Sequence, residues 1–306
     1  MKMYDLAIIG GGPAGLTAGL YGARANLKTI VIEKGLHGGQ MQNTLEIENY
    51  PGFEKVTGPE LSDHMYKQVL ALGLDWKLGE VNKADLAGQP KTIEVGGEEI
   101  QAGAVILATG GQPRYLGVPG EKELAGRGVS YCATCDGAFF RHQDVLVVGG
   151  GDSAVEEGLF LTRYASSVTI IHRRDELRAL PVFQERAFAN PKMKFVWDTV
   201  VEKIEGDGRV SGVLARNVKD GSTRVIPGTG VFIYIGFIPN TGFLKGMPFL
   251  NEEGYIITGQ NMATSIPGVF AAGDVRDTPL RQIVSAAGDG GIAAMEAYQY
   301  LENLEA

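Results

Sequence analysis

The chain is built from short apolar runs, each closed by glycine and followed by a helix-like stretch. The first run is Leu6–Ile9, and the run Val145–Val148 opens the same pattern a second time. A short apolar run bounded by turn residues is typical of a buried strand. Strands that alternate with helices indicate a parallel sheet. The pattern therefore predicts an α/β fold assembled from strand–turn–helix units.

These two strand–turn–helix units are an internal repeat. Asp5-Leu-Ala-Ile-Ile-Gly-Gly-Gly recurs as Asp144-Val-Leu-Val-Val-Gly-Gly-Gly, an offset of 139 residues. Each copy is followed by a second apolar strand, Thr29–Ile32 in the first and Val168–Ile171 in the second. A repeat of this size indicates two similar domains in one chain.

Each copy carries a Gly-x-Gly-x-x-Gly/Ala turn between strand and helix. The first glycine permits the tight turn, the second lets a pyrophosphate approach the backbone, and the third position must be small for the helix to pack on the sheet. The helix N-terminus then offers N–H groups to the phosphates. A plain strand-to-helix turn explains one isolated copy, but two copies in the same context favour two Rossmann-like dinucleotide-binding domains. The predicted contacts are Gly10, Gly12, Pro13, Ala14 and Gly15 in the first copy and Gly149, Gly151, Asp152, Ser153 and Ala154 in the second.

The second strands of the two copies end in different charges. Glu33 ends the first one, where a carboxylate accepts hydrogen bonds from ribose hydroxyls. The same offset puts His172 at the end of the second strand, followed by Arg173, Arg174 and Arg178. Guanidinium groups suit a ribose 2′-phosphate, which they bind with paired hydrogen bonds. We therefore predict FAD at the first site and NADPH at the second, the alternative for the basic residues being a solvated surface turn.

The order of the apolar runs predicts that the second domain is inserted in the first. Ala104–Gly110 is a short buried strand of the first domain, and the Pro/Gly break Gly117–Gly120 follows it. The second domain ends near the apolar run Val231–Ile238, and residues 241–248, with Gly and Pro, lead back to the first. We predict an FAD domain of residues 1–115 and 246–306 and an NADPH domain of residues 116–245.

Composition narrows the classes of function. Glycine makes up 44 of 306 residues, about twice the usual share of roughly 7%, which fits backbone held close to ligands. The net charge of −8 argues against a nucleic acid as partner. No stretch is apolar over the roughly 18 residues of a membrane helix, and glycines interrupt the first apolar run too early for a signal peptide. We expect no nucleic acid partner, no membrane partner and a cytoplasmic location.

The two cysteines form one Cys-x-x-Cys, Cys132-Ala-Thr-Cys135, which Asp136 follows directly. A lone pair at this spacing in a reducing compartment indicates redox chemistry. A cysteine before a helix can hold a nucleophilic thiolate, and Asp136 is a candidate general acid or base. Half of a zinc site and two inert packed cysteines are the alternatives. No second Cys-x-x-Cys exists and the four histidines lack structural zinc spacing, so we predict no metal.

Together these parts predict an electron path. NADPH gives hydride to the flavin, the reduced flavin gives two electrons to the Cys132–Cys135 disulfide, and the resulting dithiol reduces an external disulfide. The protein supplies positioning, and the cofactors supply the difficult chemistry.

The whole chain resembles the bacterial-type, low-molecular-weight thioredoxin reductases, a family of flavoprotein disulfide reductases. Related flavoenzymes share the glycines but not a cysteine pair inside the nicotinamide domain, so the combination is specific. The motifs that carry the resemblance are Gly10–Gly15, Gly38-Gly-Gln40, Glu48-Asn-Tyr-Pro-Gly52, Ala108-Thr-Gly110, Cys132-Ala-Thr-Cys-Asp136, Gly149–Ala154, His172-Arg-Arg174 with Arg178, Gly273-Asp274 and Arg281-Gln-Ile283.

The resemblance implies roles that the motifs alone do not give. The second cysteine, Cys135, lies nearer the flavin, the first, Cys132, attacks thioredoxin, and Asp136 acts as the acid. Thioredoxin or a thioredoxin-like protein is then the partner, and the enzyme works as a homodimer that alternates between two domain orientations. Flavin contacts are implied for Gly39, Gln40, Asn49, Thr109, Gly110, Gly273, Asp274, Arg281, Gln282 and Ile283.

Other functions share some of these features. Relatives that take electrons from ferredoxin, or pass them to oxygen, tend to lose the basic cluster that this sequence keeps. A flavin- or nucleotide-binding sensor with a cysteine switch would not turn over rapidly. The reductase module of a peroxiredoxin system usually carries an extra N-terminal domain, whereas this sequence starts at its first strand. One small departure from the family, Asp152-Ser153 in place of a commoner Asn-Thr, concerns the nucleotide turn.

Overall fold

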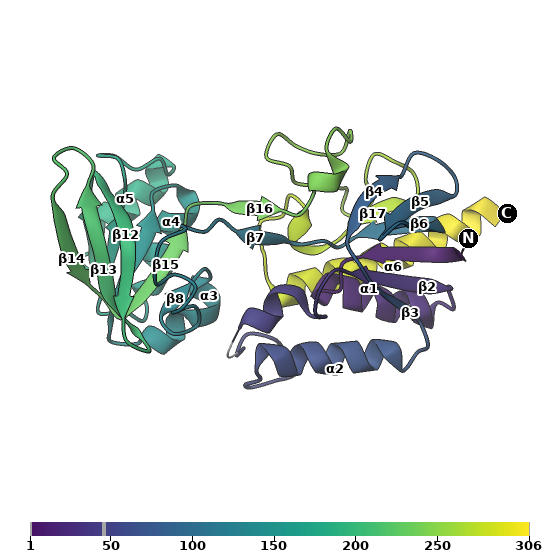
Figure 1. Ribbon diagram of the computed structural model, residues 1–306, viewed down its shortest axis with the longest axis horizontal. Helices are drawn as coiled ribbons and strands as arrows, with labels where there is room; N and C mark the ends of the chain where they lie inside the picture. Colours follow the sequence, from purple (N-terminus) through teal and green to yellow (C-terminus); the bar gives the residue numbers. More distant parts are fainter. Residues whose placement is uncertain (1, 45–46, 306) are drawn as a thin grey trace. The chain divides into compact units, whose positions relative to one another are not determined.

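The computed structural model describes residues 2–44 and 47–305. The chain forms two compact units (Figure 1). Unit 1 consists of Met1–Gln112 and Ile238–Ala306, and unit 2 consists of Pro113–Phe237. Unit 2 is therefore inserted in unit 1. The second segment of unit 1 begins at Ile238, so the Gly- and Pro-containing residues 241–248, predicted as the second crossing, lie inside unit 1.

Unit 1 is organised around a seven-stranded sheet of order β3-β2-β1-β6-β5-β4, with β17 paired to β6. The strands β1, β2, β3, β6 and β17 run parallel, and β4, β5 and β6 form an antiparallel meander. The strands are β1 (Lys2–Ile9), β2 (Thr29–Glu33), β3 (Asp75–Leu78), β4 (Val81–Asp85), β5 (Lys91–Val95), β6 (Glu98–Leu107) and β17 (Val269–Ala271). The helices are α1 (Pro13–Arg24), α2 (Gly58–Leu70) and α6 (Ile283–Glu305), with 3₁₀ turns η1 (Gly39–Asn43), η3 (Gly242–Leu244) and η4 (Gly273–Val275).

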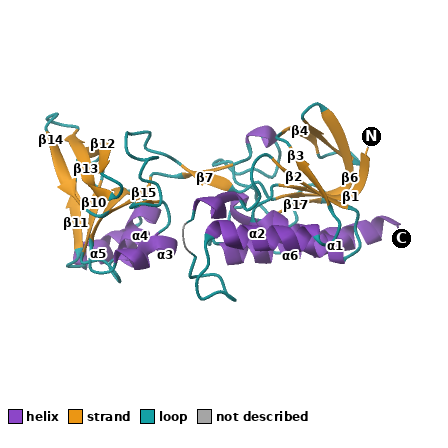
Figure 2. Cartoon of the chain, turned by 60° about the horizontal axis from the view of Figure 1, so that its bottom comes forward, coloured by secondary structure: helices purple, strands orange, loops and turns teal. Residues whose placement is uncertain are grey.

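Both faces of the sheet in unit 1 are buried, which is why β1 is a continuous apolar run. Leu6 and Ile8 point into the core that contains the alanines of α1 and α6, and Ala7 and Ile9 point into the opposite core. Figure 2 shows α1 and α6 along the same face of the sheet. The two helices pack closely, because a Cβ on Gly290 of α6 would lie 2.1 Å from the carbonyl oxygen of Ala14 in α1.

Unit 2 repeats the parallel arrangement on a smaller scale. Its main sheet has the order β11-β10-β9-β15-β8, and all of its pairings are parallel. The strands are β8 (Val129–Ser130), β9 (Asp144–Gly149), β10 (Ser167–Ile171), β11 (Met193–Val196) and β15 (Gly230–Tyr234). The helical elements are α3 (Ala133–Asp136), η2 (Gly137–Phe140), α4 (Asp152–Leu161) and α5 (Pro181–Ala189). A separate antiparallel sheet contains β12 (Thr199–Gly206), β13 (Val210–Asn217) and β14 (Thr223–Pro227).

The two connections between the units pair with each other. β7 (Gly111–Pro113) and β16 (Phe237–Pro239) form a two-stranded sheet. The apolar run Val231–Ile238, predicted as one strand, is divided between β15 and β16. Gly236 lies between them with φ of 125°, a conformation that L side chains rarely adopt, so the strand direction changes there.

The fold prediction is confirmed: both strand–turn–helix units exist, and each starts a parallel sheet. Among the described residues, none of the helices is both long and apolar enough to span a bilayer.

Candidate active site

The first glycine turn joins β1 to α1 in unit 1. A Cβ on Gly10 would lie 2.2 Å from the carbonyl oxygen of Ala108, just after β6, and one on Gly15 would lie 1.8 Å from the carbonyl oxygen of Gly10. Neither position tolerates a side chain, so the turn lies tight against the next strand. Gly12 is the N-cap of α1, and a Cβ there would meet nothing within 4 Å. The turn is closed on one side and open on the other, as an approaching pyrophosphate requires.

Glu33 ends β2 beside this turn. Its Oε2 accepts a hydrogen bond of 2.6 Å from the backbone N–H of Gly11, and its Oε1 accepts one of 2.9 Å from the N–H of Gly35. These bonds hold the carboxylate at the turn. A carboxylate has about four acceptor sites, so lone pairs remain for the hydroxyls of a ribose.

Thr109 and Gly110 follow β6, next to the same turn. The hydroxyl oxygen of Thr109 is buried and has no hydrogen-bond partner among the described residues. The backbone here is held by Asn240, whose Nδ2 donates to the carbonyl oxygen of Thr109 at 2.9 Å and whose N–H donates to that of Gly110 at 3.0 Å. A buried hydroxyl without a partner is uncommon in folded proteins. A dinucleotide bound at this edge would offer it acceptors.

Several residues for which the family resemblance implies flavin contacts lie together in unit 1. The Nδ2 of Asn49 donates a hydrogen bond of 3.0 Å to the Oε1 of Gln282, just before α6. In η1, the Nε2 of Gln40 donates a bond of 3.0 Å to the carbonyl oxygen of Gly111. Ile283, the first residue of α6, packs against the apolar cluster that contains Met41. Segments more than 200 residues apart in the sequence are thus brought together.

Asp274 follows β17 in the turn η4. Burial raises the pKa of its carboxyl to about 6, against the opposing effect of Arg281 and with a contribution from Asp289. The N–H of Gly273 donates a bond of 3.1 Å to the Oδ2 of Asp289, which anchors this turn to α6. The guanidinium of Arg281 lies 4.7 Å from the ring centre of Tyr255. A carboxyl with this pKa can accept a hydrogen bond when ionised and donate one when protonated.

All of these residues lie near the carboxyl ends of the parallel strands, where ligands of open α/β sheets bind. The open glycine turn, the Glu33 carboxylate at the end of β2 and the buried hydroxyl of Thr109 fit an adenine dinucleotide. The predicted residues that the structure places at this edge are Gly10, Gly12, Pro13, Ala14, Gly15, Glu33, Gly39, Gln40, Thr109, Gly110, Gly273 and Asp274, with Asn49, Arg281, Gln282 and Ile283 beside the start of α6.

The second glycine turn joins β9 to α4 in unit 2. A Cβ on Gly149 would lie 2.3 Å from the carbonyl oxygen of Tyr234, at the end of β15. Gly151 is the N-cap of α4, and the Nη2 of Arg178 lies 3.9 Å from the position of its missing Cβ. The backbone N–H of Arg178 also donates a bond of 2.7 Å to the carbonyl oxygen of Gly150. A guanidinium is therefore held at the N-terminus of α4, which fits a phosphate group.

The predicted basic cluster after β10 combines a buried histidine with exposed arginines. His172 is buried, and its ring packs so closely on the turn that a Cβ on Gly150 would lie 2.4 Å from it. Burial, followed by the nearby guanidinium groups, lowers the pKa of His172, so the imidazole is neutral at neutral pH. Arg173, Arg174 and Arg178 are exposed. The positive charge therefore comes from the arginines, whereas the ring of His172 packs against the glycine turn at Gly150.

Asp152 and Ser153 start α4, and both are exposed, whereas Ala154 is buried. The Oδ1 of Asp152 accepts a bond of 2.7 Å from the backbone N–H of Leu180. This bond ties the first turn of α4 to the end of the arginine-containing loop.

Cys132 and Cys135 form a disulfide in unit 2. Cys132 is the N-cap of the short helix α3, and Cys135 is its third residue, which brings their Cα atoms to 5.3 Å. Both side chains are half-buried. The pair follows β8, which is hydrogen-bonded to β15 in the sheet that carries the second glycine turn.

Asp136 is a half-buried acid that directly follows the disulfide. Burial raises the pKa of its carboxyl above the ordinary value, although a hydrogen bond from Ser130 opposes the rise. The Oγ of Ser130 donates to the Oδ2 of Asp136 at 2.6 Å and accepts the backbone N–H of Cys132 at 3.1 Å. Ser130 thus links the acid to the first cysteine. A carboxyl with a raised pKa is better suited to give a proton to a sulfur leaving group.

Two residues near the cysteine pair carry no signal in the sequence. The hydroxyl oxygen of Tyr234 accepts a bond of 2.6 Å from the backbone N–H of Ala133, the first residue of α3. Burial raises the pKa of Tyr234 well above its usual range, and Glu157 and Asp136 add to the rise. The Oε2 of Glu157 is buried without a hydrogen-bond partner in the described part of the chain. These groups come from β15 and α4, and only the folded sheet brings them to the disulfide.

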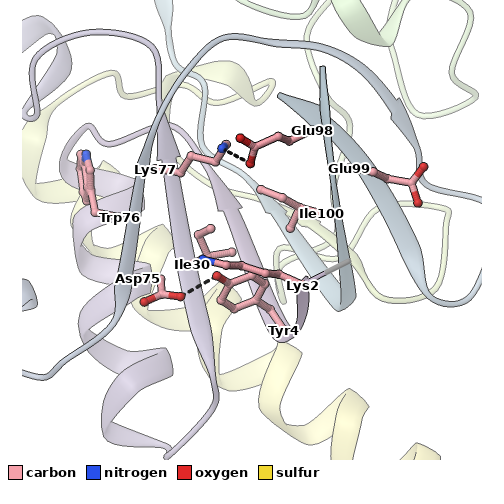
Figure 3. A pocket seen from close by; sticks show the side chains of 9 residues that line it. All are labelled: Lys2, Tyr4, Ile30, Asp75, Trp76, Lys77, Glu98, Glu99 and Ile100. Atoms are coloured by element: carbon pink, nitrogen blue, oxygen red, sulfur yellow. Dashed lines mark hydrogen bonds and ion pairs between the residues drawn. The ribbon is translucent and has the colours of Figure 1, made fainter. Parts of the chain in front are cut away.

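A cavity in unit 1 lies at the opposite ends of the strands (Figure 3). Its lining includes Lys2 and Tyr4 at the start of β1 and Glu98 at the start of β6. Tyr4 donates a bond of 2.5 Å to Asp75, and Lys77 and Glu98 form an ion pair of 2.7 Å. Charges of both signs are paired here and none of the predicted site residues lines the cavity, so it has no part in the nucleotide site.

No group of three or more His, Cys, Asp or Glu residues in the described ranges is arranged to hold a metal ion.

Residues 4–290 match a family model described as pyridine nucleotide-disulphide oxidoreductase. The chain belongs to the pyridine nucleotide-disulphide oxidoreductase family. The name of this family includes both a nucleotide and a disulfide, in agreement with the two glycine turns and the cysteine pair.

Relatives of known name narrow the likeness within this family. The chain is 52% identical to the thioredoxin reductase of Listeria monocytogenes, in an alignment that covers 99% of this chain and 96% of the relative. It is 50% identical to the thioredoxin reductase of Bacillus subtilis, with the same coverage of both chains. The solved thioredoxin reductase of Streptococcus pyogenes is 53% identical with a TM-score of 0.95, over 98% of this chain and 99% of that one. The resemblance seen in the sequence is confirmed.

Glu157 predicts a dependence of stability on pH. Burial, and secondarily Glu156, raises the pKa of Glu157 from 4.5 to about 7. As the pH rises from 4.5 to 7, the unfolded chain ionises before the folded protein does, so stability falls. We expect Glu157→Gln to escape this loss. Measured by urea unfolding, its stability relative to the parent should increase by up to about 2 kcal/mol between pH 5 and pH 8.

The control for this prediction is Glu185→Gln, on a solvent-exposed position of α5. Its difference from the parent should stay nearly constant over the same pH range. If the stability difference between Glu157→Gln and the parent also stays constant over this pH range, the pKa of Glu157 is not raised by burial.

Proposed function

We propose that this chain catalyses the NADPH-dependent reduction of a thioredoxin disulfide, through FAD and the Cys132–Cys135 pair. The observation that carries the proposal is the disulfide itself: it lies beside the half-buried acid Asp136, whose pKa is raised, in the unit that also holds the second dinucleotide turn. The relatives named thioredoxin reductase, about half identical over nearly the whole chain, support the same activity.

The two dinucleotides are assigned to the two units by charge. Unit 1 has a carboxylate, Glu33, at the turn, which suits the free ribose hydroxyls of FAD. Unit 2 has Arg173, Arg174 and Arg178 in the equivalent place, and guanidinium groups suit the 2′-phosphate of NADPH. When bound, the two cofactors supply the electron pair for the disulfide.

The chain's own residues then handle the sulfur and proton chemistry. Reduction breaks the Cys132–Cys135 bond, and the two sulfurs gain two electrons. Asp136, whose pKa is raised by burial, is positioned to give a proton to the sulfur of Cys135 while Cys132 is the nucleophile, and to take that proton back before Cys135 attacks. The thiolate of Cys132 attacks one sulfur of the partner disulfide, and Cys135 resolves the mixed disulfide by attacking Cys132. The disulfide re-forms, and the partner leaves as a dithiol after its two sulfurs take up two protons, one by way of Asp136 and one from solvent.

Three further expectations belong to this proposal. The partner is thioredoxin or a thioredoxin-like protein, the active form is a homodimer, and the location is cytoplasmic. The relatives' names support the first of these. Arg127 and Phe139–Arg141, near the cysteine pair, are candidates for the surface that binds the partner; the side chains of Arg127, Phe139 and Arg141 are exposed.

Cys135→Ser tests the disulfide relay. The variant keeps both glycine turns and their charges, so NADPH should still bleach the flavin absorbance. Without a second sulfur, no intramolecular disulfide forms, and steady-state thioredoxin reduction should fall by several orders of magnitude. Thioredoxin turnover close to that of the parent would show that electrons reach the partner by another route.

Arg173→Ala combined with Arg174→Ala tests the assignment of NADPH to unit 2. Loss of charge-assisted bonds to the 2′-phosphate should weaken NADPH binding by at least about 2 kcal/mol, or roughly 30-fold. The affinity for NADH, which lacks that phosphate, should change little. Dissociation constants for both nucleotides would be measured by fluorescence titration, with Arg209→Ala, an exposed arginine between β12 and β13, as control. Equal losses for both nucleotides would contradict the assignment.

A further inference from the structure

A buried carboxylate holds the beginning of unit 2 together. Glu121 is only 1% exposed. Its Oε1 accepts hydrogen bonds from the backbone N–H of Leu116 and from the hydroxyl of Tyr131, both at 2.9 Å. Its Oε2 accepts the backbone N–H of Gly117 at 2.7 Å. Three donors thus converge on one carboxylate that takes no part in the chemistry described above.

The burial of this charge is costly unless its donors stay in place. A carboxylate removed from water is stabilised only when its oxygens are well hydrogen-bonded, and breaking such a set leaves an uncompensated buried charge. Burial and the bond to Glu121 raise the pKa of Tyr131 far above its usual range, so Tyr131 remains a donor at every ordinary pH. The cluster of Glu121, Leu116, Gly117 and Tyr131 is therefore expected to be rigid.

The donors come from two places that matter for the proposed reaction. Leu116 and Gly117 follow β7, the first connection from unit 1, which ends at Pro113. Tyr131 directly precedes Cys132, and its ring also makes an edge contact with Tyr115, with ring centres 5.5 Å apart. Glu121 consequently joins the first connection to the residue that leads into the redox pair.

The second connection is attached to a different element. β16 begins three residues after β15, and β15 pairs with β9, so that Tyr234 lies opposite Gly149. β9 leads into the second glycine turn. The first connection is thus linked to the cysteine pair by side-chain bonds, whereas the second is linked to the nucleotide turn by the sheet.

We propose that Glu121 is a positioning residue for the cysteine pair: by binding Leu116, Gly117 and Tyr131 together, it makes the approach to Cys132 move as one body with the first connection. The consequence for catalysis rests on the proposed function. A shift of about 1 Å in a reacting group can cost up to a hundredfold in rate, so loosening this cluster should impair disulfide reduction. The nucleotide turn, held by β9 and β15, should be spared.

The structural part is tested by amide hydrogen exchange on the full-length, oxidised protein. Tyr131→Phe removes a single hydroxyl. If Glu121 couples the two segments, exchange at the amides of Leu116 and Gly117 should become roughly tenfold faster or more, although these residues keep their own bonds to Glu121. Glu121→Gln should accelerate exchange at both residues 116–117 and residues 129–133. Faster exchange confined to residues 129–133 in Tyr131→Phe would overturn the proposal.

Glu123→Gln is the matched control. Glu123 lies in the same turn and accepts the backbone N–H of Gly120 at 3.0 Å, but it is exposed. Its substitution should leave exchange at residues 129–133 unchanged. The same acceleration in this variant as in Glu121→Gln would mean that any loosening of the turn has this effect, and Glu121 would have no special role.

The kinetic part compares two reactions, the reduction of the flavin by NADPH and the reduction of thioredoxin by the cysteine pair. In Glu121→Gln, reduction of the flavin by NADPH should stay within about twofold of the parent, whereas kcat for thioredoxin should fall roughly tenfold. An equal fall in both rates would contradict the selective role. If the parent itself reduces no thioredoxin, the proposed function fails, and the exchange result still decides whether Glu121 couples the two segments.

Discussion

The close contact between a glycine turn and the neighbouring strand organises both units. In unit 1 the missing side chain of Gly10 allows the turn to lie against the carbonyl oxygen of Ala108, and in unit 2 that of Gly149 does the same against Tyr234. Any Cβ would push the turn away from the sheet, and with it the N-terminus of the following helix. The contact therefore sets where the helix N–H groups point, and each nucleotide site is built outward from it. The strands that end beside the turns supply the acid in one unit and the arginines in the other.

Burial is the second constraint, and it acts on protons. Asp136, Glu157 and Asp274 all have carboxyl pKa values raised chiefly by burial, and two of them lie in unit 2 near the disulfide. A disulfide that accepts electrons needs protons close by, so acids whose carboxyl pKa values are raised by burial suit this centre. Glu121 shows the opposite solution, since its three donors stabilise the buried carboxylate. The free-energy cost of burying a carboxylate thus has two outcomes in this protein. It raises the pKa of Asp136, which can then supply a proton, and at Glu121 it is offset by hydrogen bonds that hold neighbouring segments together.

Local sequence was sufficient for the parts of the site that depend on neighbours in the chain. The apolar runs, the turn glycines, Glu33 and the cysteine pair are local patterns, and the structure has the corresponding elements at those positions. The burial of His172 could not be predicted locally, because it depends on Gly150, which lies 22 residues earlier and leaves room for the ring. The partners of α3 were missed for the same reason: Tyr234 is 101 residues from Ala133 and meets it only when β15 joins the sheet. The second connection was placed too late because Gly236 divides an unbroken apolar run into two strands.

The electron path from NADPH to thioredoxin is tested most directly by an anaerobic reaction that is followed by the flavin absorbance. The purified protein, reconstituted with FAD, is mixed with NADPH or NADH, and oxidised thioredoxin is then added. We expect rapid bleaching with NADPH, little with NADH, and recovery of the flavin colour when thioredoxin is added. No bleaching with either nucleotide would contradict the assignment of unit 2 to NADPH, and bleaching without recovery would contradict thioredoxin as the disulfide that accepts the electrons.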